Sequence, residues 1–385
     1  MYNFIYFLPT SIYFLFANSY FLGFLMATYL LVFAGLLRSK LKIPTPTQLF
    51  LSLFFFINYC VTTNQIDTNN LIQLFFLISV ILSFRQIKPI INDILDYQVK
   101  HINFLLSLFQ LIFIVNFSLE IIIDLPKKYF FPFLEHSHFA LAYAPFLFYA
   151  ILTKTRLQAL LLTALSFGYA YLLPNLTVML VAMAGTSLFI FFRLELIFRL
   201  IIFNILIIIL TIILLNIDNI IAYLQINNPY IYYRLTQQNV VQNTSLNVWI
   251  HAWYLAFLTL IQYPFGIGFE GLSIFQKLPV TGYEDLITVK GIQISRYDLG
   301  VLAPKIIVEY GVFGIFLIYL FINKSKSLIM LIKKGLYDKN SLLMFCYIIA
   351  LFIELIFRTT GLWSLNVLFV MYGLFNKNFN KNTLY

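Results

Sequence analysis

Long runs of apolar residues, separated by short polar breaks, follow one another along almost the whole chain. The runs are continuous and lack the two-residue alternation of a membrane β-barrel, so each is predicted to be a helix that satisfies its own backbone hydrogen bonds in lipid. A bilayer core about 30 Å thick requires about 20 apolar residues per helix, and fewer for short helices in a bundle. The pattern predicts spans at residues 3–17, 19–37, 48–63, 70–85, 103–123, 134–153, 157–173, 175–192, 197–216, 304–323, 341–357 and 361–376.

One segment interrupts this rhythm. Residues 217–303 contain no convincing full span and are predicted to form a large outer loop inserted into a single membrane domain, residues 1–385. Within the loop, Trp249–Gln262 is apolar but short, which favours a helix lying at the lipid surface, with a thirteenth half-span as the alternative. Because loops carry chemistry on a rigid scaffold, this loop is where a function other than transport would be located.

The composition agrees with a polytopic membrane protein. The chain has 385 residues, 61% of them hydrophobic and 10% charged, with a mean hydropathy of +0.89. Soluble domains are about half apolar and about a quarter charged, so a water-soluble enzyme, a disordered protein and a secreted disulfide scaffold are excluded. Cys60 and Cys346 lie inside apolar runs and are predicted to be buried free thiols.

The net charge of +10 indicates an orientation. With the N-terminus in the cytoplasm, the predicted cytoplasmic segments contain 17 of the 25 basic residues and only 4 of the 15 acidic ones. This asymmetry is the one expected of a membrane protein, and it argues against nucleic-acid binding as the cause of the basic excess. No basic segment precedes the first span, which is predicted to be an uncleaved anchor, and both termini are predicted to be cytoplasmic.

Ionisable residues in or beside a span are costly and are therefore functional candidates. Glu135 opens the sixth span, either as a carboxylate stabilised by the helix dipole or as a base or sugar-binding carboxylate. His136 and His138 are two residues apart, so on a helix they point to different faces and are not expected to share a metal; both are candidate substrate-binding residues. Glu354 and Arg358 have the spacing of a structural ion pair on one helix face.

The predicted loop contains several candidates for anion binding. Arg234, among tyrosines, can pack on aromatic rings or clamp a phosphate. Arg296 and Asp298 can form a local ion pair, and Lys305 at the outer mouth of the tenth span can add to a cationic site. Trp249 can stack on a sugar or anchor the loop in the headgroups, and the anchoring role is favoured.

Two glycine-rich strings lie near the end of the loop. The first, Gly266–Gly271, has the spacing GxGxxG but follows a helix and lacks the strand and acidic residue of a dinucleotide site. It predicts a tight turn where the backbone approaches another segment. In the tenth span, Gly311 and Gly314 predict close helix packing, beside Glu309 as an intramembrane carboxylate near the outer leaflet and a candidate for substrate binding.

These strings together resemble the O-antigen polymerase and ligase superfamily. The resemblance rests on the late outer loop with an early arginine, on Pro264–Gly268 (PFGIG) and on Ile306–Gly314 (IIVEYGVFG). Glu135–Ala140 (EHSHFA) is similar to the polymerase pattern Glu-Pro-Ser-aromatic-aromatic-Ala, with His136 in place of the proline. The resemblance covers the topology and roughly residues 130–320.

The resemblance implies a metal-independent glycosyltransferase of GT-C-like fold, with no cofactor, at the periplasmic face of the bacterial inner membrane. Its partners would be membrane lipid and a donor and an acceptor linked to undecaprenyl pyrophosphate, and it allows for a chain-length regulator protein. In this scheme Arg234 grips the pyrophosphate with help from Arg296 and Lys305, and Glu135 or Asp298 accepts the proton of the acceptor hydroxyl.

Three alternatives stay open. The ligases of the superfamily carry a histidine about nine residues before the glutamate of the Glu-x-Gly string, a position that falls near Gly300 here, and no histidine follows His251. The polymerase is therefore favoured over the ligase. A flippase or transporter of lipid-linked sugars would be expected to show repeats or broken helices, and no sequence repeat is visible. A scaffold without chemistry is the third alternative.

Overall fold

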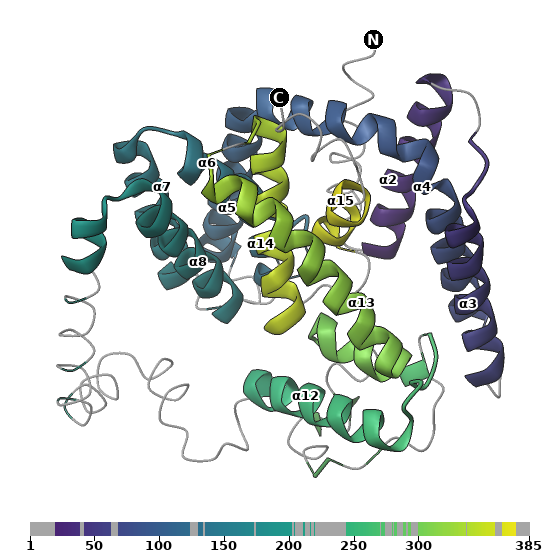
Figure 1. Ribbon diagram of the computed structural model, residues 1–385. Coiled ribbons are helices and arrows are strands. Elements are labelled where there is room, and N and C mark those ends of the chain that lie inside the picture. Colours follow the sequence, from purple (N-terminus) through teal and green to yellow (C-terminus); the bar gives the residue numbers. More distant parts are fainter. Residues whose placement is uncertain are drawn as a thin grey trace.

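The computed structural model describes residues 20–38, 42–62, 68–123, 130–133, 135–172, 175–201, 244–269, 271–273, 299–335, 337–358 and 364–374, with a few isolated positions between them. Nearly all of these residues are helical (Figure 1). The α-helices are α2 (Tyr20–Arg38), α3 (Pro46–Thr62), α4 (Thr68–Lys100), α5 (Ile102–Ile123), α6 (His136–Thr153), α7 (Arg156–Leu172), α8 (Leu176–Arg193), α12 (Thr244–Gln262), α13 (Leu302–Lys333), α14 (Lys339–Ile356) and α15 (Leu365–Leu374). A 3-10 turn, η2 (Gly271–Ser273), and one antiparallel pair, β1 (Thr288–Val289) with β2 (Ile292–Gln293), complete the described elements.

The helices confirm the prediction of an α-helical membrane protein. Among the described residues, five helices are long and apolar enough to cross a membrane: α4, α5, α8, α13 and α14. Shorter apolar stretches, Phe24–Leu37 and Pro46–Val61, lie in α2 and α3. The predicted first span, 3–17, and most of the predicted ninth span, 197–216, lie outside the described residues.

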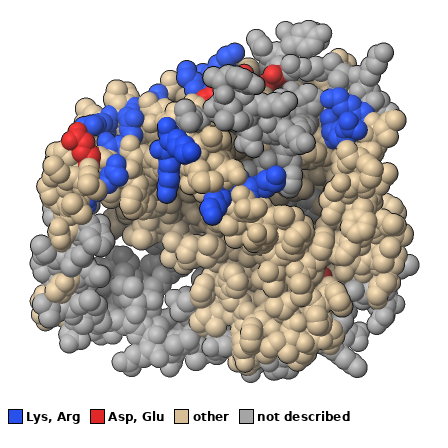
Figure 2. Space-filling view, in the orientation of Figure 1, with Lys and Arg blue, Asp and Glu red and all other residues tan. Residues whose placement is uncertain are grey.

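One end of the bundle is held together by polar side chains. Gln86 of α4 donates to the carbonyl of Gly35 near the end of α2 (2.7 Å), and Arg193 at the end of α8 donates to the carbonyl of Leu152 in α6 (3.2 Å). Lys154, just after α6, donates to Asn103 at the start of α5. Lys and Arg side chains gather on this side, away from α12 (Figure 2). We refer to it as the basic end.

α4 continues well past its predicted span. Its second half crosses the basic end of the bundle (Figure 1), and its side chains Ile90, Ile91, Ile94 and Leu95 are buried there. Pro89 in mid-helix lacks a backbone N–H and bends helices, which accounts for the change of direction. Asn340 at the start of α14 donates to the carbonyl of Asn92 (3.3 Å) and ties α14 to this segment.

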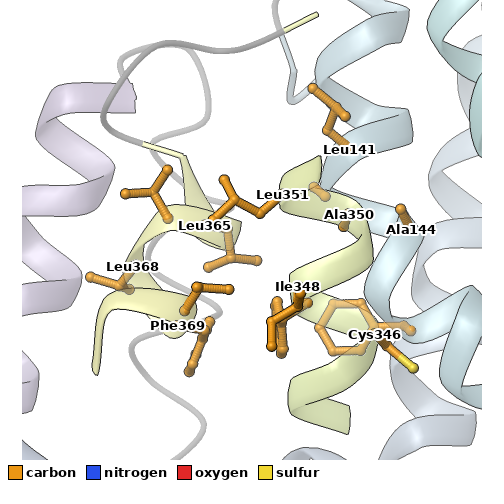
Figure 3. Packing of buried hydrophobic residues seen from close by; sticks show 14 of the residues in the cluster. Leu141, Ala144, Cys346, Ile348, Ala350, Leu351, Leu365, Leu368 and Phe369 are labelled. Atoms are coloured by element: carbon orange, nitrogen blue, oxygen red, sulfur yellow. The ribbon is translucent and has the colours of Figure 1, made fainter. Parts of the chain in front are cut away.

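The core forms where α6, α14 and α15 meet. α6 is apolar on every side and buried from Phe139 to Leu152, as a central helix must be. Phe146 of α6 meets Tyr347 of α14 edge to face at 6.0 Å, and Tyr347 stacks on Phe369 of α15 at 4.8 Å. Ala144, Ala350 and Cys346 lie among larger side chains in this contact (Figure 3), and such small residues let membrane helices approach closely.

The two cysteines differ in environment. Cys346 is buried in α14, as predicted, whereas Cys60 of α3 is exposed, so the prediction for Cys60 is wrong. Its neighbours on α3, including Ile57 and Val61, are exposed as well. An apolar run in a membrane protein can face lipid instead of protein, and sequence hydrophobicity does not distinguish the two.

Candidate functional site

A loop joins a broken helix at the end of the molecule opposite the basic end. α12 lies across this end (Figure 1), and the chain turns at Pro264–Gly268 and meets α13 where that helix is interrupted at Gly311 (φ 57°, ψ −133°). Three backbone hydrogen bonds join them: Ile267 N–H to the Val308 carbonyl (3.0 Å), Gly268 N–H to the Glu309 carbonyl (2.9 Å) and Val312 N–H to the Pro264 carbonyl (2.8 Å). These bonds replace helical ones lost at the break, as buried backbone groups require.

Glycine is needed on both sides of this junction. Gly266 has φ +81° and Gly311 has φ +57°, a region that other residues rarely adopt. A Cβ at Gly266 would collide with the carbonyl of Glu309, and one at Gly311 would collide with the carbonyl of Pro264. The predicted tight turn at Gly266 is confirmed. The predicted helix packing through Gly311 is wrong, because Gly311 ends the first part of α13 and makes room for the loop.

Lys305 and Glu309 form a buried ion pair beside the break. They are one helical turn apart in α13, with Nζ and Oε1 separated by 3.6 Å, and are 4% and 0% exposed. Removing one partner of a buried pair leaves a buried charge and is strongly destabilising. In this conformation Lys305 is paired inside the protein, so a direct contact between either side chain and a substrate would require the site to open.

Glu135 lies at the start of α6 and faces the end of α14. It occupies the N-cap position, but its side chain makes no capping hydrogen bond. Oε2 accepts instead from Ser137 Oγ (3.1 Å) and from Arg358 Nη2 (3.0 Å). Both partners of the ion pair are partly accessible, with 28% of the Arg358 side chain and 30% of the Glu135 side chain exposed.

The surroundings of Glu135 favour its charged form. Burial raises the pKa of this carboxyl, but the Arg358 guanidinium, His138 and the Ser137 hydroxyl outweigh burial and hold the pKa below its ordinary value. Glu135 is therefore a carboxylate at neutral pH. A general base works best with a pKa nearer the working pH, so the ion pair restrains Glu135 from accepting a proton.

The predicted ion pair between Glu354 and Arg358 is wrong. α14 ends at Ile356, with Phe357 as its C-cap, so the two residues are not on one continuous helix face. Glu354 is fully buried, and its Oε1 accepts from Nδ2 of Asn366 in α15 (2.6 Å). The same Nδ2 donates to the carbonyl of Leu141 in α6 (3.0 Å), which joins three central helices through one amide.

The two histidines beside Glu135 have separate surroundings. The His136 ring packs against Phe130, with ring centroids 4.9 Å apart, whereas His138 acts electrostatically on Glu135. Among the described residues, no three His, Cys, Asp or Glu side chains come together in a group that could hold a metal ion.

Trp249 ties α12 to α14. Its indole N–H donates to the carbonyl of Ile356, the last residue of α14, at 2.7 Å. The Trp249 ring also meets Trp253 edge to face at 6.4 Å. Trp249 thus fixes the segment that carries Arg358, and its N–H is engaged in this bond.

Two features of the site were not predicted from the sequence. Arg358 is the first charged residue after the eleventh predicted span on the outer side, a signal that could have marked it as a site residue. His251 is buried on the inner face of α12, and its Nδ1 lies 2.8 Å from Oγ1 of Thr281. No motif in the sequence indicates that His251 and Thr281 lie close together.

Three predicted site residues, Arg234, Arg296 and Asp298, lie outside the described residues. Of the others, Glu135, His136 and His138 gather at the start of α6, with Trp249 attached to the nearby end of α14. Lys305 and Glu309 lie in the interior beside the helix break.

Comparisons of the chain with known protein families, with characterised proteins and with solved structures gave no match. The fold and the site define the class of protein: an α-helical membrane protein with a carboxylate–guanidinium pair at the end of its bundle opposite the basic end.

Proposed function

We propose that the chain is an O-antigen, or related surface-polysaccharide, polymerase. It joins oligosaccharide repeat units carried on undecaprenyl pyrophosphate at the periplasmic face of the bacterial inner membrane. The proposal includes twelve spans in a GT-C-like arrangement, cytoplasmic termini and no metal or cofactor. Membrane lipid and the lipid-linked donor and acceptor are the partners, with a chain-length regulator protein as an additional one.

The observation that carries this proposal is the Glu135–Arg358 pair, located at the start of α6, whose other end lies at the basic end. If the basic end faces the cytoplasm, as the positive-inside rule favours, the pair faces the periplasm, and this supports a role in joining lipid-linked glycans. A carboxylate and a guanidinium are the groups that metal-free glycosyl transfer needs: one accepts a proton, and the other balances the charge on the departing pyrophosphate.

The glycine junction supports the same proposal. The two strings on which the resemblance rests, Pro264–Gly268 and the segment around Gly311, form one backbone-bonded unit in the fold. A broken helix is also found in transporters, so a lipid-linked oligosaccharide flippase is the second candidate function.

Reconstitution distinguishes the candidates. Purified protein is placed in liposomes with a lipid-linked repeat unit on the lumenal or the outer leaflet, and the glycans are separated by length. A polymerase gives a ladder of two and more units without another protein. Movement of the intact repeat unit between leaflets with no ladder would indicate a flippase, and transfer only onto a lipid A core acceptor would indicate a ligase. Either outcome would overturn the proposal.

A further inference from the structure

The ion pair at the start of α6 has properties that a purely structural contact does not need. In the part of the chain that the structure describes, the Arg358 guanidinium reaches Glu135 through Nη2 alone. A guanidinium has five N–H donors in a planar fork, and that fork binds phosphate oxygens in pairs. Both side chains are partly exposed, and ion pairs at such positions add little stability.

The backbone around Arg358 is held by hydrogen bonds, and 28% of its side chain is exposed. The Arg358 N–H donates to the carbonyl of Ile353 (3.3 Å), and the preceding Phe357 N–H donates to the same carbonyl (2.9 Å). Trp249 holds the Ile356 carbonyl from α12. These contacts fix the backbone that carries Arg358, so the exchange proposed below requires movement of its partly exposed side chain only.

We propose that Arg358 exchanges partners during the reaction: it is bound to Glu135 in the empty site and transfers to the pyrophosphate of the lipid-linked donor when the donor arrives. This inference rests on the proposed function. It assigns direct contact with the donor to Arg358, which was not among the site residues predicted from the sequence. It also makes the ion pair control when Glu135 can accept a proton.

The exchange links donor binding to activation of the base. Without Arg358 the burial of Glu135 is no longer offset by the guanidinium, so its pKa rises and it becomes a better proton acceptor. The remaining groups that act on the carboxylate are His138 and the Ser137 hydroxyl, both on α6. Glu135 would then be an effective base only when a donor is bound.

The acceptor oxygen forms a bond to the anomeric carbon of the donor, and its proton passes to the Glu135 carboxylate. The bond between that carbon and the pyrophosphate oxygen breaks, and its electron pair stays on the oxygen, where Arg358 balances the charge. When undecaprenyl pyrophosphate leaves, Glu135 releases its proton to water and Arg358 returns to it.

Binding measurements separate this mechanism from a structural ion pair. The probe is radiolabelled undecaprenyl pyrophosphate, titrated against the purified full chain in nanodiscs, with undecaprenol as the control that lacks phosphate. Arg358→Ala is expected to weaken binding at least tenfold, and Arg358→Lys less, because an ammonium cannot bind two oxygens at once. Glu135→Gln is expected to tighten binding several-fold, because the competing carboxylate is gone, while turnover falls about a hundredfold or more.

The opposite direction of the two changes is the decisive result. If the pair only holds the fold, both variants change binding in the same direction or not at all, and either result overturns the exchange. Matched controls are Arg156→Ala and Glu195→Gln, which break an exposed ion pair at the basic end (3.7 Å) and should leave affinity unchanged. If Arg358→Ala does not fold, Arg358→Lys and Glu135→Gln still give the opposed shifts or contradict them.

The outcome also separates this inference from the proposed function. If the wild type binds the probe, the variants shift binding as expected and no glycan ladder forms, the polymerase proposal is rejected while the anion-binding role of Arg358 is retained. If Arg358→Ala makes a normal glycan ladder, the partner exchange is rejected while the polymerase proposal is retained.

Discussion

The backbone N–H of Val312 donates to the carbonyl of Pro264 across 2.8 Å, and so the first residue after the break in α13 is bonded to the loop that follows α12. Backbone groups of the loop bond to the groups of α13 that the break leaves without helical partners. Ile267, Val308 and Glu309 are buried at this junction, and a buried backbone group without a hydrogen-bond partner is costly, so neither the loop nor the break is expected to be stable without the other.

The stability cost of replacing a glycine with alanine should therefore depend on its position. Gly266→Ala and Gly311→Ala combine a left-handed backbone with a collision against a carbonyl, and each is expected to lower the free energy of unfolding by at least about 3 kcal/mol. Gly335 has φ +71° but open space around it, so Gly335→Ala should cost only about 1–2 kcal/mol. Gly168 lies in α7 with nothing near it, and Gly168→Ala should stabilise by up to about 1 kcal/mol.

Unfolding in mixed micelles with increasing SDS, followed by far-UV circular dichroism, measures this order. Equal costs at Gly266 and Gly335 would mean that backbone conformation alone matters and that the loop does not press on α13.

The glycine positions show what the sequence can and cannot predict. The five helices long and apolar enough to cross a membrane were predictable, because a long apolar run has few stable alternatives in lipid. Two glycines three residues apart suit close helix packing, but they suit a helix break equally well. The difference lies in the loop around Gly266, about 45 residues earlier in the chain. No local sequence pattern around Gly311 indicates that this loop contacts α13.

Arg358 illustrates a second limit. Its spacing from Glu354 predicts a pair only if the helix continues for another turn, and α14 ends at Ile356. Helix ends are set by capping and by tertiary contacts such as the Trp249 bond to the Ile356 carbonyl. Because that contact comes from α12, a separate segment, the true partner of Arg358 could not be predicted from the local sequence.

The Trp249 bond predicts a difference between two neighbouring tryptophans. Trp249→Phe keeps an aromatic ring but removes the donor to the Ile356 carbonyl, and it should cost about 0.5–1.5 kcal/mol and loosen α12. Trp253→Phe is the matched control, since Nε1 of Trp253 has no hydrogen-bond partner within the described residues. Hydrogen–deuterium exchange should rise across α12 and the end of α14 in Trp249→Phe only. Identical exchange in the two variants would show that packing, and not the bond, holds α12.

The Glu135 pair predicts a loss of stability in acid. The folded-state pKa of Glu135 lies below its ordinary value of 4.5, so the pair stabilises the protein fully above that value. The contribution is lost as the pH falls below about 4.5 and through the folded-state pKa, because the protonated carboxyl no longer attracts Arg358. Melting temperatures of wild type and Glu135→Gln should thus converge as the pH falls below the ordinary value of 4.5. A constant difference over this range would place the titrating group elsewhere.

The orientation can be tested with two single-cysteine variants built after replacing Cys60 and Cys346. Phe265, in the loop at the break in α13, is 81% exposed, and Tyr337, in the turn between α13 and α14 at the basic end, is 43% exposed. If the basic end faces the cytoplasm, a membrane-impermeant maleimide added to cells with a permeabilised outer membrane should label Phe265→Cys but not Tyr337→Cys. Opening the inner membrane should make Tyr337→Cys reactive, which shows that its thiol is accessible. Labelling of Tyr337→Cys alone in intact inner membranes would reverse the orientation and move the Glu135–Arg358 pair to the side where lipid-linked repeat units are made rather than joined.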